Sequence, residues 1–535
     1  MEKNPYRTIN KTIPLIIILG VAVFVTFPWF SSNFIPTHDG EYSIIRFWQF
    51  YLMISQGNFF PVIAPTINNG SGLPIFLFFY PFSNYVGALL HVFGASFVDS
   101  VKYTLGISYI VSLFGCFYWL TAFFPKRWAL SGTLVGAFIP YWFVEMYVRG
   151  SVPEMVAFAV IFLLLASIER KHAALTVALS AILLLSHNII ALLFFPLIIL
   201  YALSRNRHML VFVLLSLGVA SYFLIPAFVS QQYVTGLNTV TFSDHFAQLF
   251  ELLIPSWGTG FSGQGIDGKM SFQIGVIPFF IIVLALFLSI FSKQKDLRVL
   301  ARCILGILLV GLLMTTGISR IFWDTIPLLP FVQHPWRFLS YLLFAVPFLT
   351  AYVFSILKPK GFVMAAVVLV ALGFSFSYMR PNQYQRRSDA HYLENPNFRD
   401  GTISMGNSFS TKWMTWSPLE RQLPKVSVVN GRTTTPLVEK NYTEKTVRVT
   451  GDSQTVVTFP VAYFPGWDAT VDGKQVEIVP SEKGHIDVPV PPGEHSVTIS
   501  FGQTNDRVIG MIISLMSLMG AIILVIRYNR YRNSI

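Results

Sequence analysis

The sequence is poor in charge and in cysteine. Only 12% of its 535 residues are Asp, Glu, Lys or Arg, whereas soluble domains carry about 25%. This composition excludes an ordinary soluble protein. The two cysteines, Cys116 and Cys303, are too few for a disulfide framework and have none of the spacings of a metal site. Both fall in apolar runs, so we expect them to pack in the core.

Long apolar runs take the place of the missing charge. The chain is 53% hydrophobic, and its apolar runs reach roughly the 20 residues that a helix needs to cross a bilayer. We predict twelve membrane spans, at residues 12–30, 101–124, 128–147, 152–168, 173–188, 190–204, 209–228, 273–292, 300–317, 336–356, 361–378 and 508–527. The stretch 74–94 is also apolar, but prolines and polar residues interrupt it, so we expect a helix at the outer surface there.

The basic residues indicate how these spans are oriented. On this map both termini and alternate short loops share one side, which holds many Lys and Arg residues but only the acids Glu2, Glu169 and Asp296. Such an excess marks the cytoplasmic side of a membrane protein in the cell membrane. The formal net charge of +12 therefore reflects topology, and we expect membrane lipids rather than nucleic acid as partners.

The remaining acids outside the C-terminal domain lie on the other side. All fall at the outer ends of spans or in outer loops: Asp39, Glu41, Asp99, Glu145, Glu154, Asp244, Glu251, Asp267 and Asp324. Orientation rules say little about acids, so this bias has two open explanations. One is an outward-facing polar site, and the other is ordinary solvation of loops.

Three large outer segments follow from the span map, at 31–100, 229–272 and 379–507. The third reads as strands, because β-branched or alternating runs occur at Thr446–Val449, Thr455–Phe459, Ala469–Val471 and His495–Phe501. Asp472-Gly473 is a strong hairpin signal between two of them. We therefore predict a transmembrane domain over 1–378, an extracytoplasmic β-sandwich or jelly roll over 379–507, and a final helix with a cytoplasmic tail over 508–535.

The strongest candidate for chemistry is Thr37-His38-Asp39-Gly40-Glu41, directly after the first predicted span. A charge kept at the membrane edge is costly, which indicates a use for it. Asp39 could act as a general base on an attacking hydroxyl. His38 and Glu41 could tune its pKa, and His38 with Asp39 could help to hold a divalent cation such as Mg²⁺ or Mn²⁺. The alternative is a solvated loop in which Gly40 makes a turn.

Two further places carry polar groups near the outer membrane surface. In Arg149-Gly150-Ser151-Val152-Pro153-Glu154, the guanidinium suits bidentate recognition of phosphate, and Glu154 could fix it. The alternative is a structural ion pair between neighbouring helices. His187 lies between two short predicted spans, where it could bind a phosphate, a sugar or a metal, or simply be a satisfied polar residue.

The last candidates come from the second half of the chain. Gln333-His334-Pro335-Trp336-Arg337-Phe338 opens a predicted span, and His334 and Arg337 could bind a phosphate beside an apolar chain. The alternative is anchoring at the membrane interface by Trp336 and Arg337. In the second outer loop, Asp244, His245 and Asp267 are weaker candidates for substrate binding.

These motifs, in this order, resemble known families. A single span followed by an Asp-bearing outer loop resembles the GT-C fold of glycosyltransferases that use polyprenyl-phosphate sugars. The segments around Arg149, His187 and Trp336 resemble bacterial membrane proteins labelled 6-pyruvoyl-tetrahydropterin synthase-related. The phrase Tyr463–Lys474, with the turn Pro492-Gly493-Glu494-His495 and a final span, is similar to the tail domain of YfhO-like proteins.

The resemblance implies transfer of a sugar from a polyprenyl-phosphate donor to an extracytoplasmic glycan, polymer or lipid. An acid of the first outer loop would be the base, which by position is Asp39, and Arg149 or Arg337 would neutralise the leaving phosphate. There is no Asp-Asp or Asp-x-Asp pair, so metal dependence is open. Two other functions remain open: a transporter or flippase for lipid-linked sugars, and a membrane scaffold for the β domain.

Overall fold

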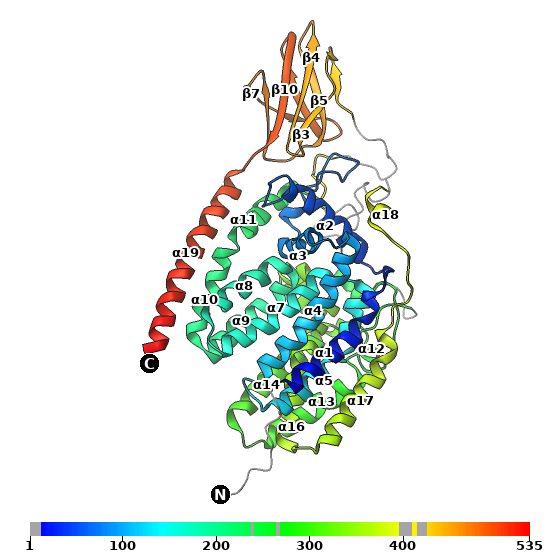
Figure 1. Cartoon of the computed structure of the whole chain (residues 1–535), viewed down its shortest axis with the longest axis vertical. Helices are drawn as coiled ribbons and strands as arrows, with labels where there is room; N and C mark the ends of the chain where they lie inside the picture. Colours follow the sequence, from blue (N-terminus) through cyan, green and yellow to red (C-terminus); the bar gives the residue numbers. More distant parts are fainter. Residues whose placement is uncertain (1–11, 237–239, 264–267, 395–408, 415–424, 535) are drawn as a thin grey trace.

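The computed structural model describes residues 12–236, 240–263, 268–394, 409–414 and 425–534. A large helical part carries a β domain at one end, and α19 (Asn505–Ser534) runs from that domain back along one side of the helices (Figure 1). The fold is therefore that of an α-helical membrane protein with a C-terminal antiparallel β domain.

All twelve predicted spans fall in described helices, but only eight to ten of them are long and apolar enough to cross a membrane. Eight are long and apolar enough to cross a membrane: α1 with η1 (Ile13–Phe30), α4 (Phe97–Leu120), α7 (Val152–Glu169), α9 (Asn188–Arg205), α14 (Lys295–Met314), η8 with α16 (Pro335–Leu357), α17 with η9 (Gly361–Met379) and α19. Two bent pairs raise the number to ten: α5 (Lys126–Ala137) with α6 and η3 (Pro140–Arg149), and α10 (Arg207–Val219) with α11 and η4 (Ser221–Tyr233). The other two segments form shorter apolar helices, α8 (Ala173–Ser186) and α13 (Val276–Phe291).

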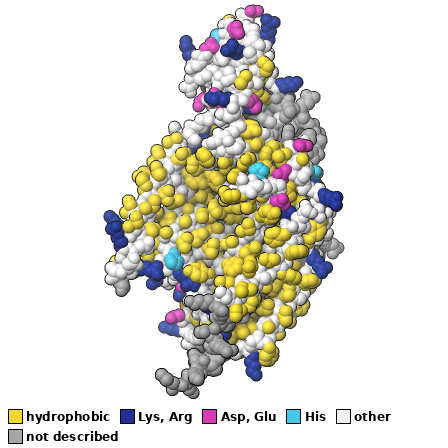
Figure 2. Space-filling view, viewed as in Figure 1, with side chains coloured by type: hydrophobic (Ala, Val, Ile, Leu, Met, Phe, Trp, Pro, Cys, Tyr) yellow, Lys and Arg dark blue, Asp and Glu magenta, His cyan; other side chains and the backbone are white. Residues whose placement is uncertain are grey.

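The surface of the helical part is apolar. Figure 2 shows hydrophobic side chains over most of this part, with Lys and Arg at its margins and on the β domain. Along α19, Ile509, Ile512, Leu515 and Met516 are each more than half exposed. Soluble proteins rarely expose a continuous apolar surface of this extent, so lipid covers it, and the chain is a multi-pass membrane protein.

The apolar stretch 74–94 does not form a span. It contains the short turn η2 (Ile75–Leu77) and the helix α3 (Pro81–Val92), which is 12 residues long. This is too short to cross a bilayer, and α3 packs against α2 (Gly40–Ser55), α4 and α8. The prolines end the apolar run early, as the sequence predicted.

The two cysteines differ in environment. Cys116 is buried in α4, as expected, but Cys303 is exposed on α14. The expectation of core packing is therefore wrong for Cys303. The physical reason is that α14 buries only one face, along Ala301, Leu305 and Leu308, and Cys303 lies on the other face.

The β domain is a two-sheet sandwich, as predicted. One sheet has the order β1 (Ser427–Val429), β5 (Thr455–Ala462), β9 (His485–Val490) and β8 (Val479–Pro480). The other has the order β2 (Arg432–Thr433), β4 (Glu444–Gly451), β10 (Gly493–Phe501), β6 (Trp467–Val471) and β7 (Lys474–Val476), and β3 (Val438–Asn441) also pairs with β4. Asp472 and Gly473 have φ of +51° and +79°, as a two-residue hairpin turn requires.

The β domain shares its core with the loop between α2 and α3. Val62, Ile63, Leu77 and Phe78 from that loop join the apolar cluster of the sandwich. The amide of Ala462 also donates a hydrogen bond to the carbonyl of Ser71, at 2.7 Å. The chain leading into α3 is therefore fixed against the β domain.

The remaining described elements are short and connect the helices. They are η5 (Phe242–His245), α12 (Leu249–Leu253), η6 (Gly317–Ser319), α15 (Arg320–Thr325), η7 (Leu329–Val332) and α18 (Asp389–Leu393). Among them, α18 has a clear structural role. The carboxylate of Asp389 accepts the amides of Phe97 and Val98, at 2.9 and 3.0 Å, so it satisfies the free amides at the start of α4.

Candidate functional site

Asp39 stands at the start of α2, where the chain arrives from α1. The loop is held by the backbone of η3 (Val144–Arg149), because the amides of His38 and Asp39 donate to the carbonyls of Val148 and Arg149, at 3.0 and 2.7 Å. The Asp39 side chain remains 37% exposed. The loop therefore presents a carboxylate that is fixed in position and still open to solvent.

Arg149 ends the π-helical turn η3 and lies beneath Asp39. Its Nη2 donates to Asp39 Oδ2 at 3.3 Å, and its Nη1 donates to both oxygens of Glu145 and to Glu154 Oε1, at 2.7–2.9 Å. Gly150 follows with φ of +62°, and a Cβ there would lie 2.0 Å from Thr37 Oγ1. A glycine is needed at this position because it allows both the left-handed turn and the close approach of the Asp39 loop.

Glu154, on α7, joins three other helices at this point. Its Oε1 accepts from Arg337 Nε at 3.2 Å and lies 3.6 Å from His187 Nε2. The Nδ1 of His187 accepts the amide of Ile190, which places the imidazole proton on the nitrogen that faces Glu154. Glu154 is fully buried, and its Oε2 has no hydrogen-bond partner in the described part of the chain.

Arg337 and Trp336 belong to η8 (Pro335–Ser340), and both are buried, at 6% and 2% exposed. Arg337 Nη1 donates to the carbonyl of Val332 and to Gln333 Oε1, at 2.8 and 3.1 Å. The Trp336 ring lies 4.6 Å from the guanidinium carbon of Arg149, which is a cation–π distance. Anchoring at the membrane interface does not fit this burial.

Two histidines, His334 and His245, lie on the side of Trp336 away from the two arginines. The ring of His334 stacks on Trp336 at 5.0 Å, and the ring of His245 meets His334 edge-on at 4.6 Å. His245 Nδ1 lies 2.7 Å from Ser262 Oγ. Burial lowers the pKa of both imidazoles, so both are neutral at physiological pH.

His38 and Glu41 flank Asp39 in sequence but face elsewhere. His38 Nε2 lies 2.8 Å from the carbonyl of Thr259, its ring stacks on Phe261 at 4.4 Å, and burial lowers its pKa. The carboxylate of Glu41 accepts from the Tyr392 hydroxyl at 3.2 Å. Glu41 therefore contacts α18 and not Asp39, and its expected part in catalysis stays a prediction.

The residues around Asp39 do not fit a divalent cation. His38 Nε2 is used by a carbonyl, Glu41 is used by Tyr392, and Asp39 is paired with Arg149. Among the described residues, no group of three or more His, Cys, Asp or Glu side chains is arranged to hold a metal. No Mg²⁺ or Mn²⁺ step is therefore assigned to this cluster.

Of the two candidates in the second outer loop that the structure describes, one reaches the cluster. His245 reaches the cluster through His334, as described above. Asp244 is exposed and, among the described residues, accepts from its neighbour Ser243, at 3.2 Å. Asp267 lies outside the described residues.

Three residues of this region were not predicted from the sequence as site residues. Glu145 had a usable signal, because it precedes Arg149 by four residues on the same helix. Arg46 also had one, since it stands within the apolar run of α2, where its guanidinium carbon lies 3.7 Å from the centre of the Phe79 ring. Tyr80 had none; its ring lies 4.4 Å from that of His187.

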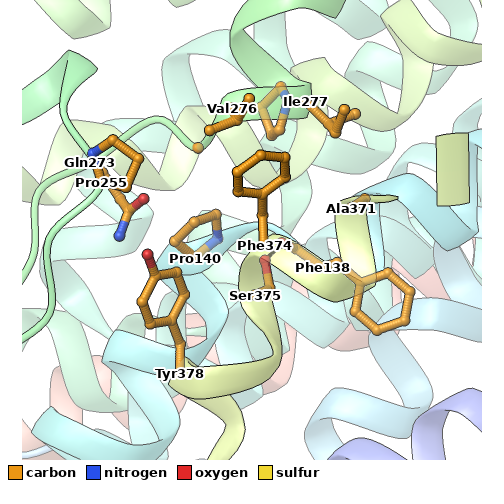
Figure 3. A pocket seen from close by; sticks show the side chains of 12 residues that line it. Phe138, Pro140, Pro255, Gln273, Val276, Ile277, Ala371, Phe374, Ser375 and Tyr378 are labelled. Carbon is orange, nitrogen blue, oxygen red and sulfur yellow. Dashed lines mark hydrogen bonds between the residues drawn. The ribbon is translucent and has the colours of Figure 1, made fainter. Parts of the chain in front are cut away.

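A small apolar pocket, with a cavity volume of about 10 Å³, lies between helices that adjoin the cluster (Figure 3). It is lined by side chains from the α5–α6 junction, the start of α13 and the end of α17, among them Phe138, Pro140, Val276, Ile277 and Phe374. Two of its polar groups are used within the protein: Ser375 Oγ donates to the carbonyl of Phe138, and Gln273 Nε2 donates to that of Ser256. The wall of the pocket is mainly apolar, and its volume is about that of one water molecule.

Comparison with known proteins finds a family match for only the C-terminal part of the chain. No curated protein matches the chain. One solved structure that resembles it is the arabinofuranosyltransferase AftD from mycobacteria, determined by single-particle cryo-EM, with a TM-score of 0.46 and 14% identity over 71% of this chain. The aligned part spans 28% of the AftD chain.

The family comparison concerns the C-terminal part. Residues 425–514 match the family described as bacterial membrane protein YfhO. This segment contains Tyr463–Lys474, so the YfhO resemblance expected for the tail domain is confirmed there. The name 6-pyruvoyl-tetrahydropterin synthase-related is not supported by the comparisons. In its β domain and the start of its last helix, the chain is thus similar to the bacterial membrane protein YfhO family.

Proposed function

We propose that this protein is a membrane glycosyltransferase that moves a sugar from a polyprenyl-phosphate donor to an acceptor outside the cytoplasm. Asp39 is its general base. The observation that carries this proposal is the difference in exposure within one ion-pair network. Asp39 is 37% exposed, whereas Arg149, Glu145 and Glu154 are at most 7% exposed. One carboxylate can reach a substrate, and the others hold its partner in place.

The network supports a base more than it supports a phosphate site at Arg149. Nη1 of Arg149 is bound by two buried carboxylates, so the guanidinium is fixed by the helices around it. Its Nη2 fixes one oxygen of Asp39 and leaves the other for an acceptor hydroxyl. A general base placed in this way contributes about 10²–10⁴-fold to a rate.

The chemical step is a displacement at the anomeric carbon. Asp39 takes the proton of the acceptor hydroxyl, and the acceptor oxygen forms a bond to that carbon. The bond from carbon to the phosphate oxygen breaks on the opposite face, and its electron pair leaves with the polyprenyl phosphate. The configuration at the anomeric carbon is inverted, as in other single displacements of this type.

The surroundings of the network suit a lipid-linked donor. The apolar pocket of Figure 3 begins at Pro140, in the helix that continues into η3 and Arg149. This pocket is too small for a polyprenyl chain, so we assign the chain to the apolar, lipid-covered surface of the helices. The β domain packs on the loop that leads to α3, and we assign it the binding of an acceptor glycan or polymer.

The distribution of basic residues supports a site of sugar transfer outside the cytoplasm. The loops with excess Lys and Arg would face the cytoplasm, together with both termini. Asp39 and the β domain would then lie outside the cytoplasm.

The test uses purified protein in lipid with a panel of radiolabelled polyprenyl-phosphate sugars. Wild type should release sugar from at least one donor, and Asp39→Asn should lose this activity by about 10²-fold or more. Asp244→Asn is the control, because Asp244 is an exposed loop carboxylate outside the network. Binding without turnover in both wild type and Asp39→Asn would favour a flippase. Neither binding nor turnover would favour a scaffold.

A further inference from the structure

The proposed displacement places its leaving phosphate away from Arg149. In an inverting transfer the base and the group that assists departure act on opposite faces of the sugar, roughly 6.5–9.5 Å apart in inverting glycoside hydrolases. Arg149 contacts Asp39 directly, at 3.3 Å, so it lies on the face of the base. Arg337 is bound by Glu154, Val332 and Gln333, which restricts it as well.

Arg46 occupies the complementary position along α2. It follows Asp39 by seven residues, which is about 10 Å along a helix and nearly the same face. The side chain is buried, at 7% exposed, and its guanidinium carbon lies over the Phe79 ring at 3.7 Å. The pKa of Arg46 falls to about 10 through burial, so it remains a cation at physiological pH.

Tyr80 lies between this arginine and the network. Its ring contacts His187 at 4.4 Å and Phe79 at 5.0 Å. The charges of Asp39, Arg46 and Arg337 all act on its phenol, and burial raises its pKa, so it keeps its proton. No side chain or backbone group in the described residues hydrogen-bonds to this hydroxyl, although Tyr80 is only 7% exposed.

We propose that Arg46 and Tyr80 bind the phosphate of the lipid-linked donor, across the reacting sugar from Asp39. This rests on the proposed function. As the bond from the anomeric carbon to the phosphate oxygen breaks, the phosphate gains the electron pair. The Arg46 guanidinium and the Tyr80 hydroxyl donate hydrogen bonds to the oxygens on which this charge develops. The Phe79 ring, under the guanidinium, limits its movement.

The position of Tyr80 also depends on the β domain. Phe78, two residues earlier, belongs to the core of the sandwich. The carbonyl of Tyr80 accepts from Asn84 Nδ2 at 3.0 Å, which fixes the start of α3. The phosphate-binding hydroxyl is thus positioned by the same contacts that attach the β domain to the helices.

The test measures binding of radiolabelled polyprenyl phosphate, and of the neutral polyprenol of equal length, to the full chain in lipid nanodiscs. Arg46→Gln and Tyr80→Phe should each weaken binding of polyprenyl phosphate by about tenfold to a hundredfold. Their affinity for the polyprenol should not change. Tyr85→Phe, on α3 directly after Tyr80 with its hydroxyl on the Phe59 carbonyl, and Arg302→Gln on α14 are matched controls that should bind as wild type does.

The outcomes separate this proposal from the proposed function. If wild type transfers sugar while both variants keep full affinity for polyprenyl phosphate, the phosphate site is wrong and the transferase stands. If wild type binds polyprenyl phosphate through both residues but transfers from no donor, the site stands and the transferase is wrong. If wild type binds no polyprenyl phosphate, both are wrong. Should Arg46→Gln not fold, Tyr80→Phe decides the test alone, because it removes one hydroxyl that bonds to no group in the described part of the chain.

Discussion

At the scale of single residues, Glu154 is the centre of the ion-pair network. It contacts Arg149, Arg337 and His187 through one oxygen, and it is fully buried. Removal of one partner from a buried ion pair leaves charge uncompensated, at a cost of about 3–5 kcal/mol. The network is therefore expected to matter for stability as well as for the placement of Asp39.

Glu154→Gln should lower the free energy of unfolding by about this amount, seen as a large fall in the midpoint of thermal unfolding in detergent. Asp324→Asn is the control. Asp324 pairs with Arg320 on the surface, with both side chains more than half exposed, and such pairs contribute about 0–1 kcal/mol. Equal thermal stability of the two variants would show that the buried network does not contribute to the free energy of unfolding.

Most of the charged residues in this network could be predicted from the sequence. Which of them contact one another could not. Asp39, Arg149, His187 and Arg337 were predicted because polar groups at the ends of apolar runs stand out. The choice between a phosphate ligand and a structural ion pair could not be made, since it depends on contacts between four helices. Structure favours the ion pair for Arg149. The contact of Glu41 with Tyr392 could not be predicted, because the direction of a side chain on its helix, and not its distance in sequence, decides what it meets.

At the scale of elements, the junction between η3 and α7 depends on Gly150. Its φ of +62° disfavours any other residue, and a Cβ added at this position would lie only 2.0 Å from Thr37 Oγ1. Both facts exclude a side chain. Gly150→Ala should lower the free energy of unfolding by more than 1 kcal/mol and displace the Asp39 loop. Gly306→Ala on α14, where a Cβ would meet nothing, should leave stability equal or slightly higher. Thermal unfolding of both variants checks this, and equal midpoints would contradict it.

The hairpin between β6 and β7 predicts a pH dependence. His495 Nδ1 lies 2.6 Å from Asp472 Oδ2, and this hydrogen bond raises the pKa of His495 and lowers that of Asp472. A raised histidine pKa stabilises the fold fully below its unfolded value of about 6.5, and the effect is lost as pH rises through the folded pKa. The lowered aspartate pKa acts in the other direction, so its effect is lost as pH falls below about 4.

Protection of the β6–β10 region against hydrogen exchange should therefore be greatest between about pH 4 and 6.5 after correction for intrinsic exchange rates. Mass spectrometry of peptides covering residues 468–500 measures it. In His495→Gln the profile should flatten above pH 6. An unchanged profile in that variant would show that the Asp472–His495 pair does not cause the pH dependence.

At the scale of the whole molecule, the side of the membrane on which the site lies is a prediction that can be checked. Ser453 is exposed in the β domain, and Gln294 is exposed between α13 and α14. In a background without Cys116 and Cys303, Ser453→Cys should react with an impermeant maleimide added to intact cells, because the β domain faces outward. Gln294→Cys should react only after the membrane is opened. The reverse pattern would invert the topology and exclude an extracytoplasmic acceptor.

The gross architecture could be predicted because hydrophobic length and β alternation are local signals. All twelve apolar segments and the four predicted strands fall in described helices and strands. The bends at Ala137–Pro140 and at Val219–Ser221, the exposure of Cys303 and the shared core with Phe78 could not be predicted. Each depends on which surfaces meet in three dimensions. Tyr80 belongs to the same class, because no local pattern connects it with Asp39.

The central claim is that Asp39 acts in the chemical step and not in binding. The most direct measurement is the single-turnover rate of sugar transfer by wild type and Asp39→Asn, with donor affinity measured on the same samples. A fall in the rate of about 10²–10⁴-fold, with donor affinity unchanged, is the predicted result. Equal single-turnover rates in the two proteins would contradict the claim, and would leave Asp39 as a partner of Arg149 in a structural network.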